Sequence, residues 1–292
     1  MIFQALDEKQ ECVGIYLGGD VIYNAIPEGL SRTWSFSSFL ADQQIEYAQV
    51  YCGGKSLEEV CPEHLKSELE RVWKKMGAFY RSFVISKIDL NQVCFYDLLP
   101  EEFLKSFCEV KNKITTHVLE NYSKPKNYDL QSHIVALTTQ ISSQRLNVDV
   151  NALRGDLSKY KTRQFFKKIN NTEPYIKYNP YGTKTGRLTT KKNSFPILTM
   201  DKKYRKIIKP NNDLFVEFDY NSAELRVLLG LSGETQPKED LHDWNTNNIF
   251  KEQYSSRDLA KKRIFSWLYN PNNRDDKVSK IYDREKLKTL YF

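Results

Sequence analysis

The 292 residues predict a mixed fold of the α/β or α+β class. Hydrophobic residues make up 40% and aromatic residues 13% of the chain, which is enough for one large or two modest globular cores. Short apolar runs that suit strands alternate with longer runs of helical period. No run of 18 apolar residues occurs, and the first residues, MIFQALDEKQ, lack the basic and apolar regions of a signal peptide. We therefore expect a soluble, cytoplasmic protein without a membrane span.

Residues 1–128 read as an α/β domain of their own. CVGIY and VIYNAI flank Gly18 and Gly19, a pattern that predicts a β-hairpin. YAQVYCGG, FVISKIDL and NQVCFYDLL are further strand candidates. A helix is expected from about Pro62, with apolar positions at Leu65, Leu69, Val72, Trp73 and Met76. The polar segment NYSKPKNYD, residues 121–129, predicts the end of this domain.

Cysteine usage indicates reduced thiols. The five cysteines give an odd count without a CxxC spacing, and all of them fall in the first 108 residues. We expect buried thiols rather than a zinc site.

Positive charge is concentrated in one region. Between Arg145 and Pro210 there are 17 Lys or Arg against 4 Asp or Glu, a local balance of +13 within a total of +7. Aromatic residues are interleaved with these charges, as expected where a polyanionic backbone and stacked bases are both bound. A solvated charged face is the alternative, although such a face usually mixes both signs. The asymmetry favours contact with nucleic acid.

The second half of the chain alternates loops, helices and one apolar strand candidate. QSHIVALTTQISSQRL predicts a helix, and Asp149 is placed to cap another. YNPYGTKTGRLTT predicts a loop with backbone freedom and many hydrogen-bond donors. In DLFVEFDY the alternating residues predict a buried strand that ends in Asp219, followed by a helix that begins near Ser222.

Asp219 is the strongest candidate for chemistry from position alone. A carboxylate at the carboxyl end of a strand is well placed to hold a hard cation such as Mg²⁺. The alternative is a buried aspartate in a salt bridge.

The helix predicted in RDLAKKRIFSWLYNP carries Arg257, Lys261, Phe265 and Tyr269 at intervals of four residues, and it is expected to stop before Pro271. Two cations near a helix start suit phosphates, and two aromatic residues farther along suit a sugar and a base. An ordinary amphipathic helix with Phe265 and Tyr269 in a core is the alternative.

Four segments in order resemble the signatures of family A DNA polymerases, the class of bacterial Pol I and many phage replicases. They are TKTGRL, FDYNSAELRVLLGLSG, DLH and RDLAKKRIFSWLY, which are similar to the family's TGRL element, motif A (DYSQIELR), DIH element and motif B (RxxxKxxxFxxxYG). The resemblance covers about residues 140–292. It implies a partial right-hand polymerase: a reduced thumb with a basic palm segment (129–212), palm motif A (213–235) and partial fingers (236–292). For the α/β domain (1–128) two alternatives stay open, a degenerate exonuclease-like domain and an unrelated one.

The resemblance also implies residue roles. Asp219 becomes one of the metal-binding aspartates of the palm, with Mg²⁺ as the cofactor. Residues implied to bind the incoming deoxynucleoside triphosphate are Tyr220, Ser222, Glu224, His242, Arg257, Lys261, Phe265 and Tyr269. Glu224 takes the position that disfavours a 2′-hydroxyl, and Phe265 the position that contacts the sugar. Residues expected to bind primer–template DNA are Lys184, Arg187, Lys191, Lys192, Arg205 and Arg226.

The chain also departs from the family pattern. Asn221, Ser222 and Ala223 replace the usual Ser, Gln and Ile, and only 37 residues separate Asp149 from Gly186, which is too few for the usual thumb. No Asp-x-Glu pair precedes Asp219, which argues against an active exonuclease in the first domain.

The second catalytic carboxylate, in the family's motif C, has no counterpart after motif B. The His242–Asp243 pair precedes motif B and is not accepted as that element. We therefore expect the first part of a split or truncated polymerase, of viral type and located in the host cytoplasm, which a second polypeptide completes. The alternatives are a nucleic-acid-binding remnant without catalysis and a fragment of a single-subunit RNA polymerase, against which Glu224 and Phe265 both argue.

Overall fold

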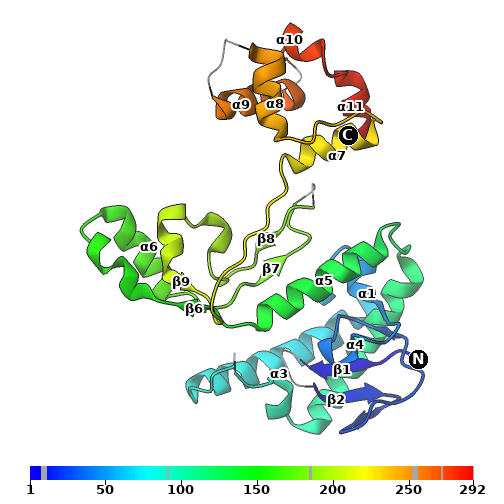
Figure 1. Cartoon of the computed structure of the whole chain (residues 1–292). Coiled ribbons are helices and arrows are strands. Elements are labelled where there is room, and N and C mark those ends of the chain that lie inside the picture. Colours follow the sequence, from blue (N-terminus) through cyan, green and yellow to red (C-terminus); the bar gives the residue numbers. More distant parts are fainter. Residues whose placement is uncertain (8–11, 91, 184–185, 252–255, 271, 292) are drawn as a thin grey trace. The chain divides into compact units, whose positions relative to one another are not determined.

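The computed structural model describes residues 1–292 except 8–11, 91, 184–185, 252–255, 271 and 292, and excludes the side chains of 12–13 and 288–291 (Figure 1). The chain divides into two compact units, Met1–Asp213 and Leu214–Phe292, hereafter unit 1 and unit 2. Both helices and small sheets are present, so the mixed fold class is confirmed at this level. No described helix is long and apolar enough to cross a membrane.

Unit 1 begins with an antiparallel sheet of β1 (Gln4–Asp7), β2 (Cys12–Leu17) and β3 (Asp20–Ile22). The predicted hairpin is confirmed, since Leu17 pairs with Asp20 across Gly18 and Gly19. Their φ angles of 61° and 103° are the left-handed conformation that a two-residue turn requires. A short parallel pair, β4 (Arg32–Thr33) and β5 (Glu46–Tyr47), follows.

Helices form most of the rest of this region. They are α1 (Ala48–Tyr51), α2 (Leu57–Val60), α3 (Lys66–Ile85), α4 (Glu101–Asn121) and α5 (Tyr128–Ser143). The predicted helix after Pro62 is confirmed, because a 3₁₀ turn over Glu63–Leu65 leads directly into α3. Its residues Leu69, Val72 and Met76 are buried against α4. The described cysteines Cys52, Cys61, Cys94 and Cys108 are buried thiols outside any disulfide bond, as predicted.

Three predicted strands are wrong. In YAQVYCGG, Tyr47 ends the short β5 and the remaining residues form α1 and a turn. FVISKIDL begins inside α3, which continues to Ile85. The described part of NQVCFYDLL, which starts at Gln92, contains only a 3₁₀ turn over Tyr96–Leu98. Burial of one helix face outweighs the strand preference of β-branched and aromatic residues. In the first case Gly53 and Gly54, with φ of 62° and 77°, end the helix rather than a strand.

The remainder of unit 1 is built on short pairs of strands. These are β6 (Asn147–Val148) with β9 (Ile208–Lys209), and β7 (Tyr178–Asn179) with β8 (Thr189–Thr190), both antiparallel. Helix α6 (Tyr160–Asn170) and 3₁₀ turns over Val150–Asp156, Ile197–Thr199 and Lys202–Ile207 complete it. Asp149 accepts a hydrogen bond from the Asn151 N–H at 3.1 Å, so the predicted cap is present, but it caps a 3₁₀ turn.

Helix α5 lies across the predicted boundary near residue 128. The Tyr47 N–H donates to the Tyr128 hydroxyl oxygen at 2.7 Å, and Tyr128 belongs to one buried cluster with Phe3 and Ile15. Residues on both sides of position 128 therefore belong to unit 1.

Unit 2 is helical. It contains α7 (Ala223–Leu231), α8 (Leu241–Asn245), a π-helix over Thr246–Phe250, α9 (Arg257–Tyr269), α10 (Asp276–Ser279) and α11 (Arg284–Tyr291). Leu225, Leu241, Ile264, Trp267 and Leu268 are buried in one core. The helices predicted after Ser222 and before Pro271 are confirmed.

The predicted buried strand over DLFVEFDY does not form. Residues 214–220 belong to no strand and are exposed, with Phe218 92% and Tyr220 87% accessible. A strand satisfies its N–H and C=O groups only through a neighbouring strand, and no described strand pairs with this segment.

Candidate functional site

Helices α7, α8 and α9 of unit 2 bring together four of the residues selected from the sequence. The rings of His242 and Phe265 meet edge to face at 5.7 Å between centroids. Phe265 and Tyr269 stack at 5.7 Å with an interplanar angle of 3°. The Tyr269 hydroxyl donates to Glu224 Oε2 at 3.0 Å. His242, Phe265, Tyr269 and Glu224 therefore form one contact chain, which we call the aromatic row.

The four-residue spacing on α9 explains why Phe265 and Tyr269 lie next to each other in the row. Ile264, Trp267 and Leu268 are buried and hold the helix on the core of unit 2. The other face then carries Phe265 and Tyr269. Phe265 packs partly against the core, but Tyr269 is 36% exposed. The alternative of two core aromatics therefore holds in part for Phe265 and not for Tyr269.

Arg257 and Lys261 lie on the same helix but differ in environment. Arg257 Nη2 and Nε donate to the two carboxylate oxygens of Asp240 at 2.7 and 3.2 Å, and Asp243 lies 3.8 Å away. This guanidinium holds the pKa of Asp240 well below its usual range. Lys261 is exposed, and within the described part of the chain no ion pair involves it.

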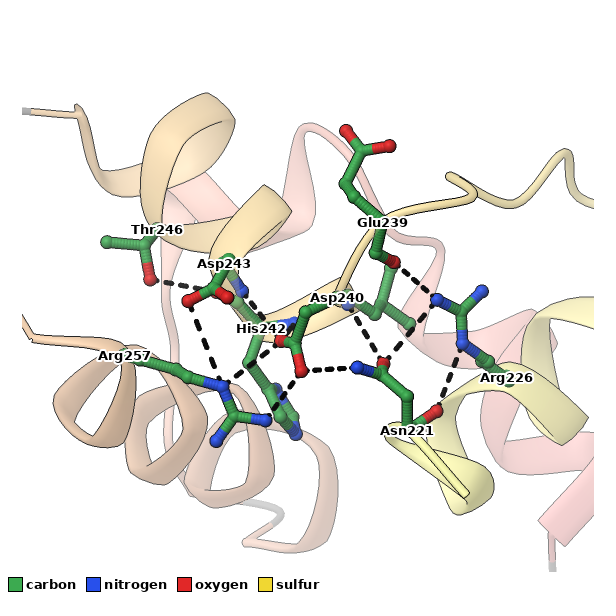
Figure 2. Close-up of polar contacts among 9 residues, drawn as sticks. Asn221, Arg226, Glu239, Asp240, His242, Asp243, Thr246 and Arg257 are labelled. Atoms are coloured by element: carbon green, nitrogen blue, oxygen red, sulfur yellow. Dashed lines mark hydrogen bonds and ion pairs between the residues drawn. The ribbon is translucent and has the colours of Figure 1, made fainter. Parts of the chain in front are cut away.

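Figure 2 shows that Asn221 joins the start of α7 to the start of α8. Its amide nitrogen donates to Asp240 Oδ2, and its amide oxygen accepts from the Leu241 N–H at 3.1 Å. Arg226 donates to the carbonyl oxygens of Asn221 and Glu239 at 3.0 and 2.5 Å. The guanidinium predicted to contact DNA thus anchors the loop before α8, and its contact with DNA stays a prediction.

His242 is buried, at 2% exposure. Burial, followed by the nearby Arg257 and Lys261 cations, lowers the pKa of its imidazole, so the ring is neutral at pH 7. Its Nδ1 is buried and has no hydrogen-bond partner among the described residues. The backbone N–H of His242 donates to Asp240 at 2.8 Å, which fixes this residue at the start of α8.

The residues of motif A that precede α7 are more open. Asp219 and Tyr220 lie on the exposed segment. Ser222 has a φ of 51° at the start of α7, and its hydroxyl is buried without a partner in the described chain. No group of three or more His, Cys, Asp or Glu side chains among the described residues is arranged to hold a metal ion.

The predicted DNA-binding residues divide between the two units. Arg187, Lys191, Lys192 and Arg205 are exposed in unit 1, and Arg226 belongs to unit 2. Lys184 lies outside the described residues.

Sequence reasoning did not select two residues that organise this site. Asp240 caps α8 and pairs with Arg257, and Asn221 was noted only as a departure from motif A. An aspartate directly before a short helical run, LHDWN, is the signal that identifies the cap.

No protein-family model, curated protein or solved structure matches the chain.

Proposed function

We propose that this chain is the nucleotide- and DNA-binding part of a family A DNA polymerase, which transfers a nucleotide from a deoxynucleoside triphosphate to a primer 3′ end under the direction of a template. One observation carries the proposal. Glu224, His242 and the pair Phe265 and Tyr269 were selected from three separate sequence segments, and they lie in one contact chain. Helical spacing accounts for the contact between Phe265 and Tyr269, so the contacts of His242 and Glu224 with that pair are what support the proposal.

The row supplies distinct interactions for a nucleotide. The exposed Lys261, one turn before Phe265, provides a cation for the phosphates. Stacked Phe265 and Tyr269 present an apolar surface for the sugar and base. The hydrogen bond from Tyr269 holds the Glu224 carboxylate in one position, as required of a residue that discriminates against a 2′-hydroxyl.

Arg257 has a more restricted role in this proposal. Because its guanidinium donates to both oxygens of Asp240, a triphosphate must share it with that carboxylate or displace it. Lys261 is therefore the main phosphate-binding cation, and Arg257 chiefly keeps α8 and His242 in place on α9.

Asp219 is proposed as one ligand of Mg²⁺, which supplies charge neutralisation on the transferring phosphoryl group. The second carboxylate is proposed to belong to a second polypeptide, as the resemblance to the polymerases and their motif C implies. The partner in this proposal is a polypeptide that carries the remainder of the palm.

The first test is primer extension. Residues 1–292 are expected to bind primer–template DNA and to extend it only when a polypeptide with the second palm carboxylate is added. Asp219→Asn should abolish extension and keep DNA binding, whereas Asp213→Asn, an exposed neighbour, should change neither. Strong extension by residues 1–292 alone would contradict the incomplete metal site.

The second test concerns the phosphates of the nucleotide. In the completed enzyme, Lys261→Gln should raise the apparent nucleotide KM about tenfold or more, since a cation facing phosphate is removed. Lys262→Gln is the matched control, because Lys262 is exposed on the same helix but lies outside the four-residue repeat. Equal effects of the two substitutions would contradict the assigned role.

A second candidate function is nucleic-acid binding without catalysis, and the basic region of unit 1 favours it. Lys191 and Lys192 are exposed there. Neutralising both with Gln should weaken DNA binding evenly across sequences and flatten the salt slope by about one to two units. DNA binding without extension, even after the missing carboxylate is supplied, would favour this candidate over the polymerase.

A further inference from the structure

Unit 1 contains a cleft whose lining shares only Lys191 with the residues predicted to bind primer–template DNA. It has a volume of about 330 Å³ and is lined mainly by residues from the C-terminal half of α5 and from strand β7 and its flanks. These two elements pack against each other (Figure 1). This volume is at the lower end of the range for small-molecule sites.

One wall of the cleft presents hydrogen-bond acceptors. Thr138, Ser142 and Ser143 line it from α5. Each hydroxyl donates its proton to a helix carbonyl three or four residues earlier, at 2.8 Å. A hydroxyl that donates its proton in this way can still accept a hydrogen bond through a lone pair of its oxygen. This wall therefore suits N–H donors and not phosphate oxygens.

The other wall carries positive charge and an aromatic ring. Lys177 and Lys191 both line the cleft, and the Lys191 N–H donates to the Lys177 carbonyl at 2.8 Å, so the two residues are cross-strand neighbours. Lys177 pairs at 2.5 Å with Glu173, which also lines the cleft, whereas no ion pair of Lys191 occurs in the described chain. Lys191 therefore carries the unbalanced positive charge of this wall. The half-buried Tyr178, next to Lys177 in the chain, lines the same cleft.

Tyr181 attaches this wall to the rest of unit 1. A Cβ at Gly54 would lie 1.9 Å from a carbon of the Tyr181 ring, so only glycine permits the contact. The Tyr181 hydroxyl is buried and has no hydrogen-bond partner in the described structure. Burial raises the pKa of Tyr181 to about 12, which keeps the hydroxyl protonated and able to donate.

We propose that this cleft binds one nucleotide unit of single-stranded nucleic acid, with its phosphate beside Lys177 and Lys191, its base edge on the hydroxyls of α5 and its ring against Tyr178. A strand fits better than a free nucleotide, because the exposed Lys192 directly follows Lys191 in the chain and offers positive charge to a neighbouring phosphate. The site lies wholly within unit 1 and does not depend on the proposed polymerase activity.

The acceptor wall makes a specific prediction about the base. Cytosine offers an exocyclic amino group, whereas thymine offers a carbonyl oxygen at the same position. Binding of fluorescein-labelled dC12 and dT12 to residues 1–292, followed by fluorescence anisotropy, should therefore favour dC12. The double variant Ser142→Ala/Ser143→Ala should remove that preference. Ser106→Ala is the matched control, because its hydroxyl also donates to a helix carbonyl but lies on α4 outside the cleft.

The aromatic wall gives a second, larger effect. Tyr178→Leu should weaken binding of dC12 about tenfold, since one stacked base is lost. Binding of a hairpin duplex, and primer extension in the completed polymerase, should be unchanged.

Several outcomes would overturn the proposal. They are equal affinity for dC12 and dT12, an undiminished affinity in a folded Tyr178→Leu variant, or dCMP bound as tightly as dC12. If Tyr178→Leu does not fold, as judged by circular dichroism, the serine double variant decides alone. Loss of extension in an Asp219→Asn variant with the dC12 preference intact would separate the two proposals.

Discussion

Two regions of unit 2 were both predicted from residue patterns, and they differ completely in structure. In the aromatic row, residues spaced by four come together on α9 and contact α7 and α8. Residues 214–220 alternate along an apolar run, but they are exposed and pair with no described strand. A helix completes its backbone hydrogen bonds within itself, whereas a strand needs a second strand. A local sequence pattern is therefore enough to predict helix α9, whereas a strand over residues 214–220 would also need a second strand to pair with.

The largest expected change in the free energy of unfolding comes from comparing one substitution in each region. Trp267→Ala should destabilise unit 2 by about 3–5 kcal/mol, because the 1% exposed indole is replaced by a cavity. Phe218→Ala, at 92% exposure, should change the free energy of unfolding by less than about 0.5 kcal/mol. Denaturant unfolding followed by circular dichroism measures both. Comparable losses would mean that residues 214–220 pack in solution.

A smaller effect is expected at the connection between α8 and α9. Asp240→Ala removes the cap of α8 and the partner of Arg257, and should cost about 1–2 kcal/mol. Asp240→Asn keeps an oxygen that accepts from the backbone and should cost less than half as much. The same unfolding measurement distinguishes them, and equal costs would show that the cap contributes little.

The stability of unit 2 should decrease at acidic pH because His242 is buried. Because the pKa of the buried imidazole is lowered in the folded state, the unfolded chain binds a proton that the folded chain excludes. Stability of unit 2 should thus be full above about pH 6.5 and fall below it, by at most about 1.4 kcal/mol per pH unit. His242→Gln should flatten this decline in melting experiments between pH 5 and 8. An unchanged slope would show that His242 takes up its proton without unfolding.

The smallest stability change should come from Tyr269→Phe. It deletes the hydrogen bond to Glu224 at an exposed position and should cost about 0.5 kcal/mol. Its effect on nucleotide choice should be larger, since Glu224 loses its fixed orientation. Ribonucleotide incorporation by the completed enzyme measures this, and unchanged discrimination would mean that Glu224 is held by other contacts.

Much of the helical structure was predictable from sequence because its signals are local. The helix after Pro62, helix α5 and helix α9 all follow apolar periodicity with clear starts or stops. The hairpin at Gly18 and Gly19 followed from turn chemistry alone. YAQVYCGG was misread because an apolar run of that length suits a short helix as well as a strand, and only its contacts decide.

The candidate site was predictable in part. The stacking of Phe265 on Tyr269 follows from spacing on α9. The contacts of His242 and Glu224 with these rings, and the position of Asp240 beside Arg257, depend on how separate helices pack. No local pattern links residues 17 positions apart on separate helices. The role of Arg226 was hidden for the same reason, since its acceptors are backbone carbonyls of a loop.

The contact between Gly54 and Tyr181 restricts which residues natural sequence variants can carry at position 54. A side chain at position 54 would collide with the Tyr181 ring, and its φ of 77° would strain most residues as well. A smaller residue at 181 relieves the collision but not the strain. Among natural variants of this chain, glycine should therefore persist at position 54 even where a smaller residue replaces Tyr181, 127 residues later in the chain.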